Sequence, residues 1–90
     1  MTTPVHVPAR HRFEATVDGH AGRLDYSLSD GVLTIVHTEV DPALEGKGVA
    51  GALVRAALDH ARASGLKVHP SCEYAASYMD RHPEAKSLRV

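Results

Sequence analysis

Apolar and polar residues alternate along the first half of the chain, and two Asp-Gly pairs, at positions 18–19 and 30–31, interrupt the alternation. Asp-Gly is the preferred two-residue turn of a β-hairpin, because both central positions take a positive φ. The pattern therefore predicts a three-stranded antiparallel meander over residues 12–40. In the register that these turns set, one face of the meander is apolar and comprises Phe13, Leu24, Tyr26, Leu28, Leu33 and Ile35.

The same register pairs Glu14 with Arg23 across the first hairpin, so that opposite charges face each other and favour this alignment. Across the second hairpin it pairs Leu24 with His37. Side chains two residues apart on a strand share a face of the sheet. We therefore expect His37 and Glu39 on the apolar face of the meander.

The second half of the chain changes to a helical period. Apolar residues recur every three or four positions from Val49 onward, and Gly65 is expected to end this helix. A short strand follows over residues 66–70, and a second helix over residues 71–82. The first helix connects the strand over 32–40 to the strand over 66–70, which predicts that these two strands are parallel. The predicted fold is α+β (α/β), in the order β-β-β-α-β-α, with a mixed sheet.

Size and composition are those of a small globular protein, with 90 residues, 43% of them hydrophobic, and a formal net charge of -1. They predict a single domain over residues 12–90 after a loose N-terminal arm over residues 1–11. The near-neutral charge argues against a nucleic-acid partner, and no apolar run approaches the roughly 20 residues that span a membrane. With a single cysteine and no visible signal peptide, we expect a cytoplasmic protein.

A glycine-rich segment, Gly46-Lys47-Gly48-Val49-Ala50-Gly51, leads into the first helix. Glycines let the backbone approach a ligand closely, and the unpaired amides at a helix start attract phosphate. The spacing also fits Gly-x-Gly-x-x-Gly, but in the dinucleotide fold that motif directly follows a strand within a series of βα units. Two interpretations remain: a phosphate-binding turn, or glycines that let the helix pack tightly on the sheet.

Several segments after residue 36 form a recognisable set: His37-Thr38-Glu39-Val40, Glu45-Gly46-Lys47-Gly48-Val49-Ala50 and Pro70-Ser71-Cys72, followed by Tyr78 and His82-Pro83-Glu84. The set resembles the minimal branch of the GNAT superfamily of acyl-CoA N-acyltransferases. The resemblance implies that backbone amides of the glycine turn hold the pyrophosphate of acetyl-CoA. The residues implied in binding are Val40, Gly46, Lys47, Gly48, Val49, Ala50 and Gly51. Glu45 departs from the superfamily pattern, which has Gln or Arg at this position.

The resemblance also places the thioester between the two parallel strands, and the candidate catalytic residues near it are His37, Glu39, Cys72 and Tyr78. A neutral imidazole at His37 can take a proton from the incoming ammonium. The alternative for His37 is a hydrogen bond within the sheet, and for Glu39 a solvated strand end. The acetyl acceptor that the resemblance implies is an amine, either of a protein or of a small molecule.

Cys72 is expected in the first turn of the second helix, after a Ser71 cap, where a thiol becomes more nucleophilic. It would line the thioester pocket, carry the acetyl group transiently, or act as a small core residue. Tyr74 and Tyr78 share a face of this helix. One of them would protonate the coenzyme A thiolate, as a tyrosine does in larger relatives, or both are packing residues.

The favoured function is an acetyl-CoA-dependent N-acetyltransferase that acts by direct attack of the amine. The alternatives are a non-catalytic module that binds coenzyme A or acyl-CoA, and a small nucleotide-binding interaction domain. We expect no metal, because His69 and Cys72 offer one His-x-x-Cys pair whereas zinc sites pair ligands at both ends. The sequence leaves the oligomeric state open.

Overall fold

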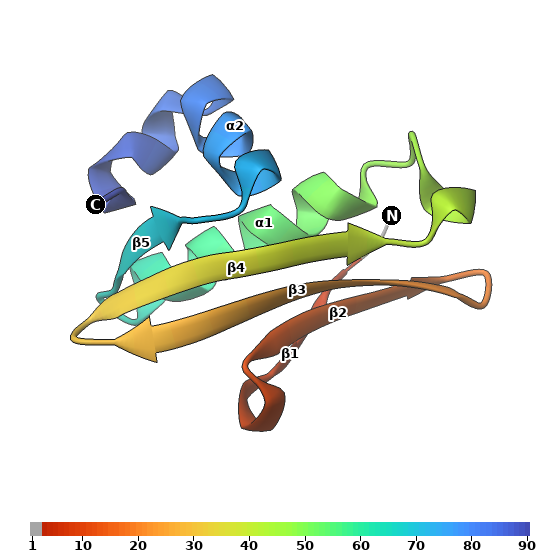
Figure 1. The fold of residues 1–90 in the computed structure, drawn as a ribbon, viewed down its shortest axis with the longest axis horizontal. Helices are drawn as coiled ribbons and strands as arrows, with labels where there is room; N and C mark the ends of the chain where they lie inside the picture. Colours follow the sequence, from red (N-terminus) through yellow and green to blue (C-terminus); the bar gives the residue numbers. More distant parts are fainter. Residues whose placement is uncertain (1–2) are drawn as a thin grey trace.

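A computed structural model describes residues 3–90 of the chain (Figure 1). Its centre is a five-stranded sheet with the strand order β1-β2-β3-β4-β5. The strands are β1 (Val5–Val7), β2 (Arg12–Val17), β3 (His20–Ser29), β4 (Val32–Val40) and β5 (Lys67–Pro70). The two α-helices are α1 (Val49–Ala63) and α2 (Glu73–Arg81), and short 3-10 helices lie at Pro8–Arg10, Pro42–Leu44 and Pro83–Leu88.

The antiparallel meander is formed by β2, β3 and β4, as predicted. Both Asp-Gly pairs are turns in which the aspartate and the glycine have positive φ. Glu14 pairs with Arg23 in the register that these turns imply. After α1 crosses over the sheet, β5 lies parallel to β4. The expected mixed sheet and α+β architecture are therefore confirmed.

The hydrophobic core lies between α1 and one face of the sheet. From α1 it takes the stripe that the helical period predicted, and from the strands the inward-facing residues of the meander. Its largest fully buried side chains include Leu24, Leu33, Ile35, Leu53 and Met79. α2 packs beside α1 and contributes Ala75 and Met79. The opposite face of the sheet, which we call the open face, carries polar side chains of β2, β3 and β4. They include Arg12, Glu14, Arg23, Asp25, His37 and Glu39.

The N-terminal segment corrects one expectation, because residues 5–10 do not form a loose arm. β1 pairs with β2 at the edge of the sheet. The His6 ring stacks on Phe13 with 4.3 Å between ring centroids, and His6 Nε2 lies 2.6 Å from the Tyr26 hydroxyl. These contacts dock a segment whose sequence shows no periodicity. Residues 1 and 2 of the expected arm lie outside the described residues.

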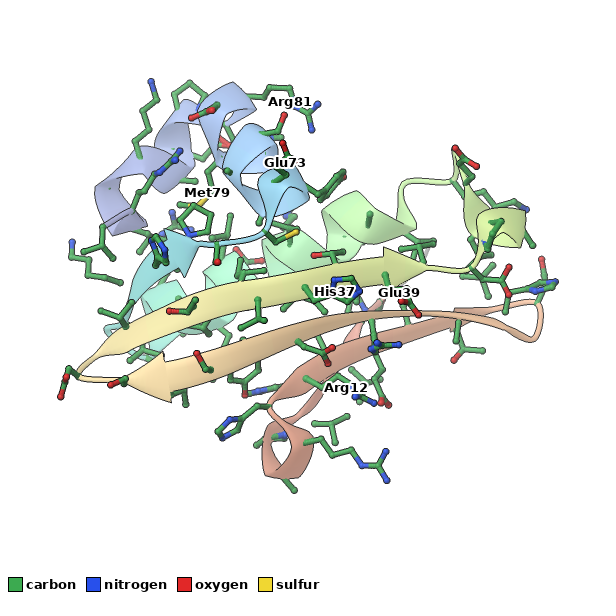
Figure 2. The ribbon with its side chains drawn as sticks, viewed as in Figure 1. Arg12, His37, Glu39, Glu73, Met79 and Arg81 are labelled. Carbon is green, nitrogen blue, oxygen red and sulfur yellow. The ribbon has the colours of Figure 1, made fainter. Side chains whose placement is uncertain are left out.

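A β-bulge in β4 corrects the predicted register. Tyr26 pairs with Ile35 as expected, but Leu24 pairs with Thr38 rather than with His37. Val36 is the extra residue, and its side chain is exposed. One inserted residue moves every following side chain to the other face of the sheet. His37 and Glu39 therefore lie on the open face, not on the apolar face, and Figure 2 shows them close together along β4.

The second helix begins later than predicted. α2 starts at Glu73, so Cys72 is the residue that precedes the helix rather than a member of its first turn, and Ser71 is not its cap. The Cys72 backbone is extended and its amide bonds to the Ile35 carbonyl, so helical conformation begins only after it. Neither α-helix of residues 3–90 is long and apolar enough to cross a membrane.

Candidate functional site

The strands β4 and β5 diverge partway along β4. They pair from Val32 to Ile35, and beyond that point β5 ends and the chain turns into α2. The Cys72 amide donates a hydrogen bond to the Ile35 carbonyl at 3.0 Å, which is the last backbone link across the two segments. β4 then continues to Val40, still paired with β3 but no longer with β5 (Figure 1). The backbone pairing of the sheet therefore ends between the second half of β4 and the start of α2, and we call this divergence the opening.

The connection from β4 to α1 is held by a compact turn. Asp41 Oδ1 accepts a hydrogen bond from the Ala43 amide at 2.9 Å, and this contact starts the 3-10 helix over Pro42–Leu44. Leu44 is buried and anchors the turn in the core. Gly46 and Gly48 both have φ near +80°, a conformation that side chains with a Cβ rarely adopt. These glycines bring the chain around to the start of α1.

The start of α1 carries amides that no side chain caps. Gly48 is the residue before the helix, and among the described residues no side chain accepts a hydrogen bond in the capping position. The first helical bond runs from the Ala52 amide to the Gly48 carbonyl, at 3.0 Å. The amides of Val49, Ala50 and Gly51 come before it in the helix, where backbone donors have no intrahelical partner. Such a group attracts an anion.

A cavity of about 450 Å³ lies at this helix start, and we call it the helix-side cavity. Its walls come from the end of β4, the turn over 41–46 and the first turn of α1. It brings together six of the seven residues that the sequence predicted for coenzyme binding: Val40, Gly46, Gly48, Val49, Ala50 and Gly51. Tyr74 of α2 closes one side of the cavity.

Lys47 is the predicted binding residue that does not line the helix-side cavity. Its amide donates to the Leu44 carbonyl at 3.1 Å, so this backbone group already has a partner within the turn. Glu45, in contrast, does line the cavity. A carboxylate therefore stands at the wall where the superfamily pattern has Gln or Arg.

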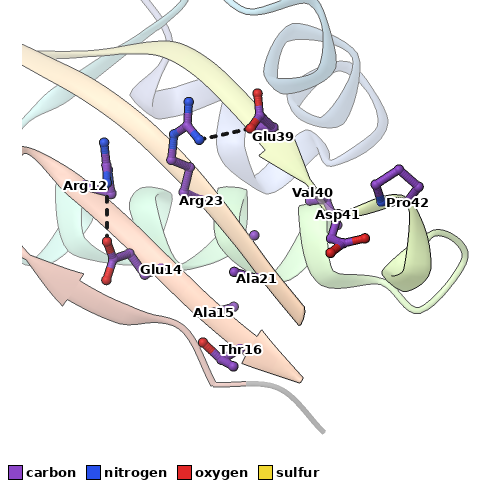
Figure 3. Close-up of a pocket in the computed structure, with 11 residues that line it drawn as sticks. Arg12, Glu14, Ala15, Thr16, Ala21, Arg23, Glu39, Val40, Asp41 and Pro42 are labelled. Carbon is purple, nitrogen blue, oxygen red and sulfur yellow. Dashed lines mark hydrogen bonds and ion pairs between the residues drawn. The ribbon is translucent and has the colours of Figure 1, made fainter. Parts of the chain in front are cut away.

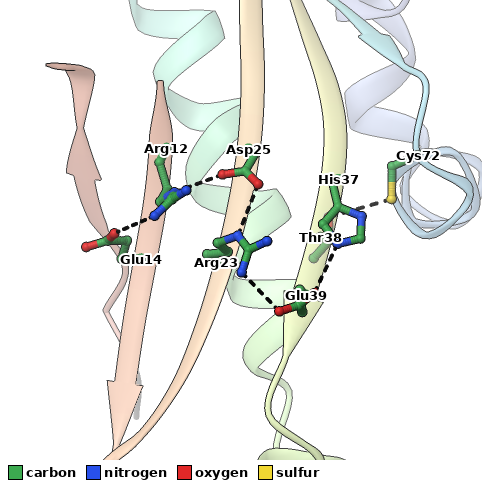
Figure 4. A network of polar contacts seen from close by, with 8 residues as sticks. All are labelled: Arg12, Glu14, Arg23, Asp25, His37, Thr38, Glu39 and Cys72. Carbon is green, nitrogen blue, oxygen red and sulfur yellow. Dashed lines mark hydrogen bonds and ion pairs between the residues drawn. The ribbon is translucent and has the colours of Figure 1, made fainter. Parts of the chain in front are cut away.

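Cys72 lies at the opening between β4 and α2. Its Sγ is 3.7 Å from Thr38 Oγ1, and the side chain is partly buried (Figure 4). Burial raises the pKa of the Cys72 thiol, but the nearby Ala75 amide and the Thr38 hydroxyl outweigh it, so that the pKa is lowered. A lowered pKa increases the fraction of nucleophilic thiolate at a given pH.

His37 and Glu39 contact each other on the open face. His37 Nε2 lies 3.3 Å from Glu39 Oε1, and Arg23 Nη1 donates to Glu39 Oε2 at 3.0 Å. The hydrogen bond from His37 and the charge of Arg23 lower the pKa of Glu39 below its ordinary value. The structure therefore keeps this carboxylate ionised beside the imidazole.

The two tyrosines of α2 have different surroundings. The Tyr78 ring stacks on His82 with 3.9 Å between centroids, and burial raises the pKa of its hydroxyl. Tyr78 does not line the helix-side cavity, whereas Tyr74 does. Both approach the start of α1, since a Cβ placed on Gly51 would lie 3.4 Å from the Tyr74 hydroxyl and 3.6 Å from the Tyr78 ring. The helical spacing of the two tyrosines was visible in the sequence, but which of them reaches the cavity was not.

A second cavity, of about 770 Å³, opens on the other side of the sheet (Figure 3). We call it the open-face cavity. Its walls come from β2 and β3, with both polar residues and the small residues Ala15, Ala21 and Gly22, together with Glu39 of β4. Val40, Asp41 and Pro42 line both cavities. The end of β4 therefore separates two cavities, one on each face of the sheet. Within residues 3–90, no three His, Cys, Asp or Glu side chains group as a metal site.

Comparison with known proteins places this geometry in a family. Residues 12–88 match the family described as GCN5-related N-acetyl-transferase. The chain is similar to Protein NATD1 of Mus musculus, at 32% identity over 81 residues that cover 87% of this chain and 74% of the mouse protein. It is also similar to Protein NATD1 of Homo sapiens, at 38% identity over 52 residues that cover 58% of this chain and 46% of the human protein.

The fold has a counterpart among solved structures. A GCN5-like protein from Staphylococcus aureus, solved by NMR in solution, superimposes with a TM-score of 0.75 over 97% of this chain and 86% of that one, at 24% identity. At this identity the likeness concerns the fold alone. The family match, in contrast, covers most of the sequence. The chain therefore belongs to the GCN5-related N-acetyltransferase family.

Proposed function

We propose that this protein transfers the acetyl group of acetyl-CoA to an amine. The observation that carries the proposal is the helix-side cavity, which is lined by Val49, Ala50 and Gly51 of the uncapped helix start and by Gly46 and Gly48, both with positive φ. A helix start of this kind binds phosphate through its amides and its dipole. The chain belongs to a family of N-acetyltransferases, and this membership supports acetyl transfer to an amine as the type of reaction.

We place the pyrophosphate of the acetyl donor in the helix-side cavity, at the start of α1. Gly46 and Gly48 keep the backbone free of side chains where the phosphates approach. From there the thioester would extend along the second half of β4 to the opening at Cys72. Glu45 adds a negative charge to the wall, and Lys47 is the nearby cation. The glycine turn thus supports pyrophosphate binding mainly through its backbone.

The amine would approach from the open face, where His37 and Glu39 lie. In the direct reaction, the nitrogen lone pair attacks the thioester carbonyl carbon, a C–N bond forms, and the C–S bond breaks. The nitrogen gives up one proton and the departing coenzyme A thiolate gains one. We assign the first transfer to His37, whose Nε2 contact with Glu39 leaves Nδ1 available.

For the second transfer, we assign Tyr74 or Tyr78 as the proton donor to the thiolate. Tyr74 lines the helix-side cavity, and Tyr78 has a raised pKa that keeps its hydroxyl protonated. Cys72 lines the thioester region in the direct route. Its lowered pKa also permits an alternative route through an acetyl-cysteine.

Calorimetric titration with acetyl-CoA, followed by measurement of free thiol released in the presence of an amine panel, tests the proposal. Binding together with amine-dependent thiol release is the expected result. Binding without release would make the protein a non-catalytic acyl-CoA module. Stabilisation by ATP or NAD but not by acetyl-CoA in a thermal shift experiment would contradict the proposal.

A further inference from the structure

The open face carries a continuous polar network across β2, β3 and β4 (Figure 4). Arg12 Nε donates to Asp25 Oδ1 at 2.8 Å, and Arg23 Nε donates to Asp25 Oδ2 at 3.1 Å. Arg23 also donates through Nη1 to Glu39 Oε2 at 3.0 Å. Asp25 therefore holds both guanidinium groups, and Arg23 connects it to the strand that bears the proposed base.

Each oxygen of the Glu39 carboxylate has its own partner. Oε2 accepts from Arg23, and Oε1 lies 3.3 Å from His37 Nε2. A carboxylate held on one oxygen cannot rotate freely about its terminal bond, so its other oxygen stays directed at the imidazole. An imidazole that donates from Nε2 has its lone pair on Nδ1. The network thus selects one of the two neutral forms of His37.

The Arg23–Glu39 end of the network borders a cavity. Arg23 and Glu39 both line the open-face cavity, which lies on the side of the sheet opposite α1. The side chains of His37 and Glu39 are more than half exposed, so both are accessible from the open face, although His37 is not among the residues that line the cavity. The guanidinium lies one strand further from the opening at Cys72 than the imidazole does.

We infer that Arg23 is a positioning residue, whose fork between Asp25 and Glu39 orients the carboxylate so that His37 keeps its proton on Nε2 and offers Nδ1 to the acceptor amine. The inference rests on the proposed function, since it gives His37 the role of base. In this role Arg23 acts through Glu39, and the inference requires no contact of its guanidinium with the acetyl donor or the reacting nitrogen.

Arg12 provides a matched control within the same network. It binds the same aspartate from the same face of the sheet, but its other partner is Glu14, at 3.5 Å, and not Glu39. Arg12→Gln removes a guanidinium of equal charge one strand away. A general stabilising role of the network would make the two arginines equivalent, whereas positioning of His37 depends on Arg23 alone.

The experiment compares Arg23→Gln, Arg12→Gln and the unmodified protein by two independent readouts. The first is the ¹⁵N spectrum of the His37 imidazole at neutral pH, which reports the protonated nitrogen and needs no turnover. We expect Nε2–H in the unmodified protein and in Arg12→Gln, and a mixture of both forms in Arg23→Gln. The second is turnover at saturating acceptor, for which we expect about a tenfold lower kcat in Arg23→Gln, as part of the 10²–10⁴-fold contribution of a general base. Arg12 also lines the open-face cavity, so Arg12→Gln is expected to change the KM for the acceptor but not kcat. Melting temperatures check that both variants fold. If Arg23→Gln does not fold, Arg23→Lys replaces it in the comparison.

The two readouts separate the possible failures. Equal ¹⁵N spectra in Arg23→Gln and Arg12→Gln would overturn the positioning role, whatever the activity. Normal turnover in His37→Ala would also overturn it, while leaving acetyl transfer intact. If the unmodified protein fails to bind acetyl-CoA, the proposed function is lost and the role of Arg23 in it is lost too. The spectra then still show whether Arg23 sets the His37 proton.

Discussion

The Cys72 thiol lies 3.7 Å from the Thr38 hydroxyl, and this contact joins the residue before α2 to the half of β4 that β5 does not pair with. The two residues are far apart in the sequence, and they meet because β5 ends just where the bulge in β4 has turned Thr38 toward the helix side of the sheet. The thiol is thereby fixed at the edge of the opening between the strands, next to the path that we propose for the thioester.

Replacement of Cys72 by alanine is expected to slow acetyl transfer without changing acetyl-CoA affinity. Cys72 does not line the helix-side cavity, so the phosphates keep their site. Steady-state kinetics and calorimetry measure the two quantities. A complete loss of turnover, with recovery of an acetylated Cys72 from the unmodified protein, would favour the acetyl-cysteine route over direct attack. Normal turnover would reduce Cys72 to a packing residue.

Gly48→Asp is expected to abolish acetyl-CoA binding, because it places a carboxylate against the pyrophosphate. The backbone at Gly48 has φ +76°, and a Cβ there would meet no atom within 4 Å. Asp and Asn tolerate this conformation better than other residues with a side chain. Gly48→Asn is therefore the matched control, with the same shape and no charge.

Calorimetry on both variants separates charge from bulk. A weaker effect of Asn than of Asp assigns the loss to repulsion of the phosphates. Equal losses would point to steric blockage, and unchanged affinity in Gly48→Asp would remove the glycine turn from the binding site altogether.

The turns, the meander, the crossover and the helical stripe were all predictable because each follows from local chemistry. Asp-Gly favours a hairpin turn through its own backbone preferences. The helical recurrence of apolar residues in α1 extends over fifteen consecutive residues. The bulge at Val36 was not predictable in the same way. Nothing in the alternation of β4 marks the extra residue, since Val36 is apolar and yet exposed.

The candidate site was predictable in part for the same reason. The helix-side cavity gathers a contiguous segment of sequence, so six of its predicted residues are found together. Tyr74 enters the cavity through the packing of α2 on α1, which is a tertiary relationship. His6 likewise shows no pattern in sequence, because its partners Phe13 and Tyr26 belong to other strands.

Acidification is expected to destabilise the protein through His6. Burial, and then the nearby His60, lower the pKa of His6 below its ordinary value of about 6.5. Below that pH the unfolded chain binds the proton more readily than the folded protein does, so stability falls as the pH drops from 6.5 toward the lowered pKa. Above 6.5 neither state is protonated and the effect is absent.

Thermal melts between pH 5 and pH 7.5 measure this dependence. His6→Phe removes the titrating group and keeps an aromatic ring on Phe13. We expect a smaller decrease in Tm on acidification in the variant than in the unmodified protein. Equal decreases would show that His6 contributes nothing to the acid sensitivity.

Gly22→Ala is expected to destabilise the protein by overpacking. A Cβ on Gly22 would lie 3.1 Å from Val49 Cγ1 and 3.2 Å from Val40 Cγ2, so these two side chains have to shift by a few tenths of an ångström. Overpacking of this kind costs about 1–3 kcal/mol. Val40 and Val49 also line the helix-side cavity, and acetyl-CoA affinity should therefore fall as well.

The double variant Gly22→Ala/Val49→Ala tests the cause. Truncation of Val49 removes the methyl group that a Cβ on Gly22 would crowd. The double variant should therefore lose less free energy of unfolding than the sum of the two single variants. Denaturant unfolding measures the three free energies. Simple additivity would show that the contact between these positions is not the source of the instability.

The bulge at Val36 also has a consequence for the order in which the proposed acetyl donor and acceptor bind. Because the strand end that follows it forms the wall of one cavity on each side of the sheet, donor and acceptor would have separate entrances. Neither molecule would need to leave, or to arrive first, for the other to enter. Kinetics with intersecting lines and no fixed order of addition would be the signature of such a two-sided sheet.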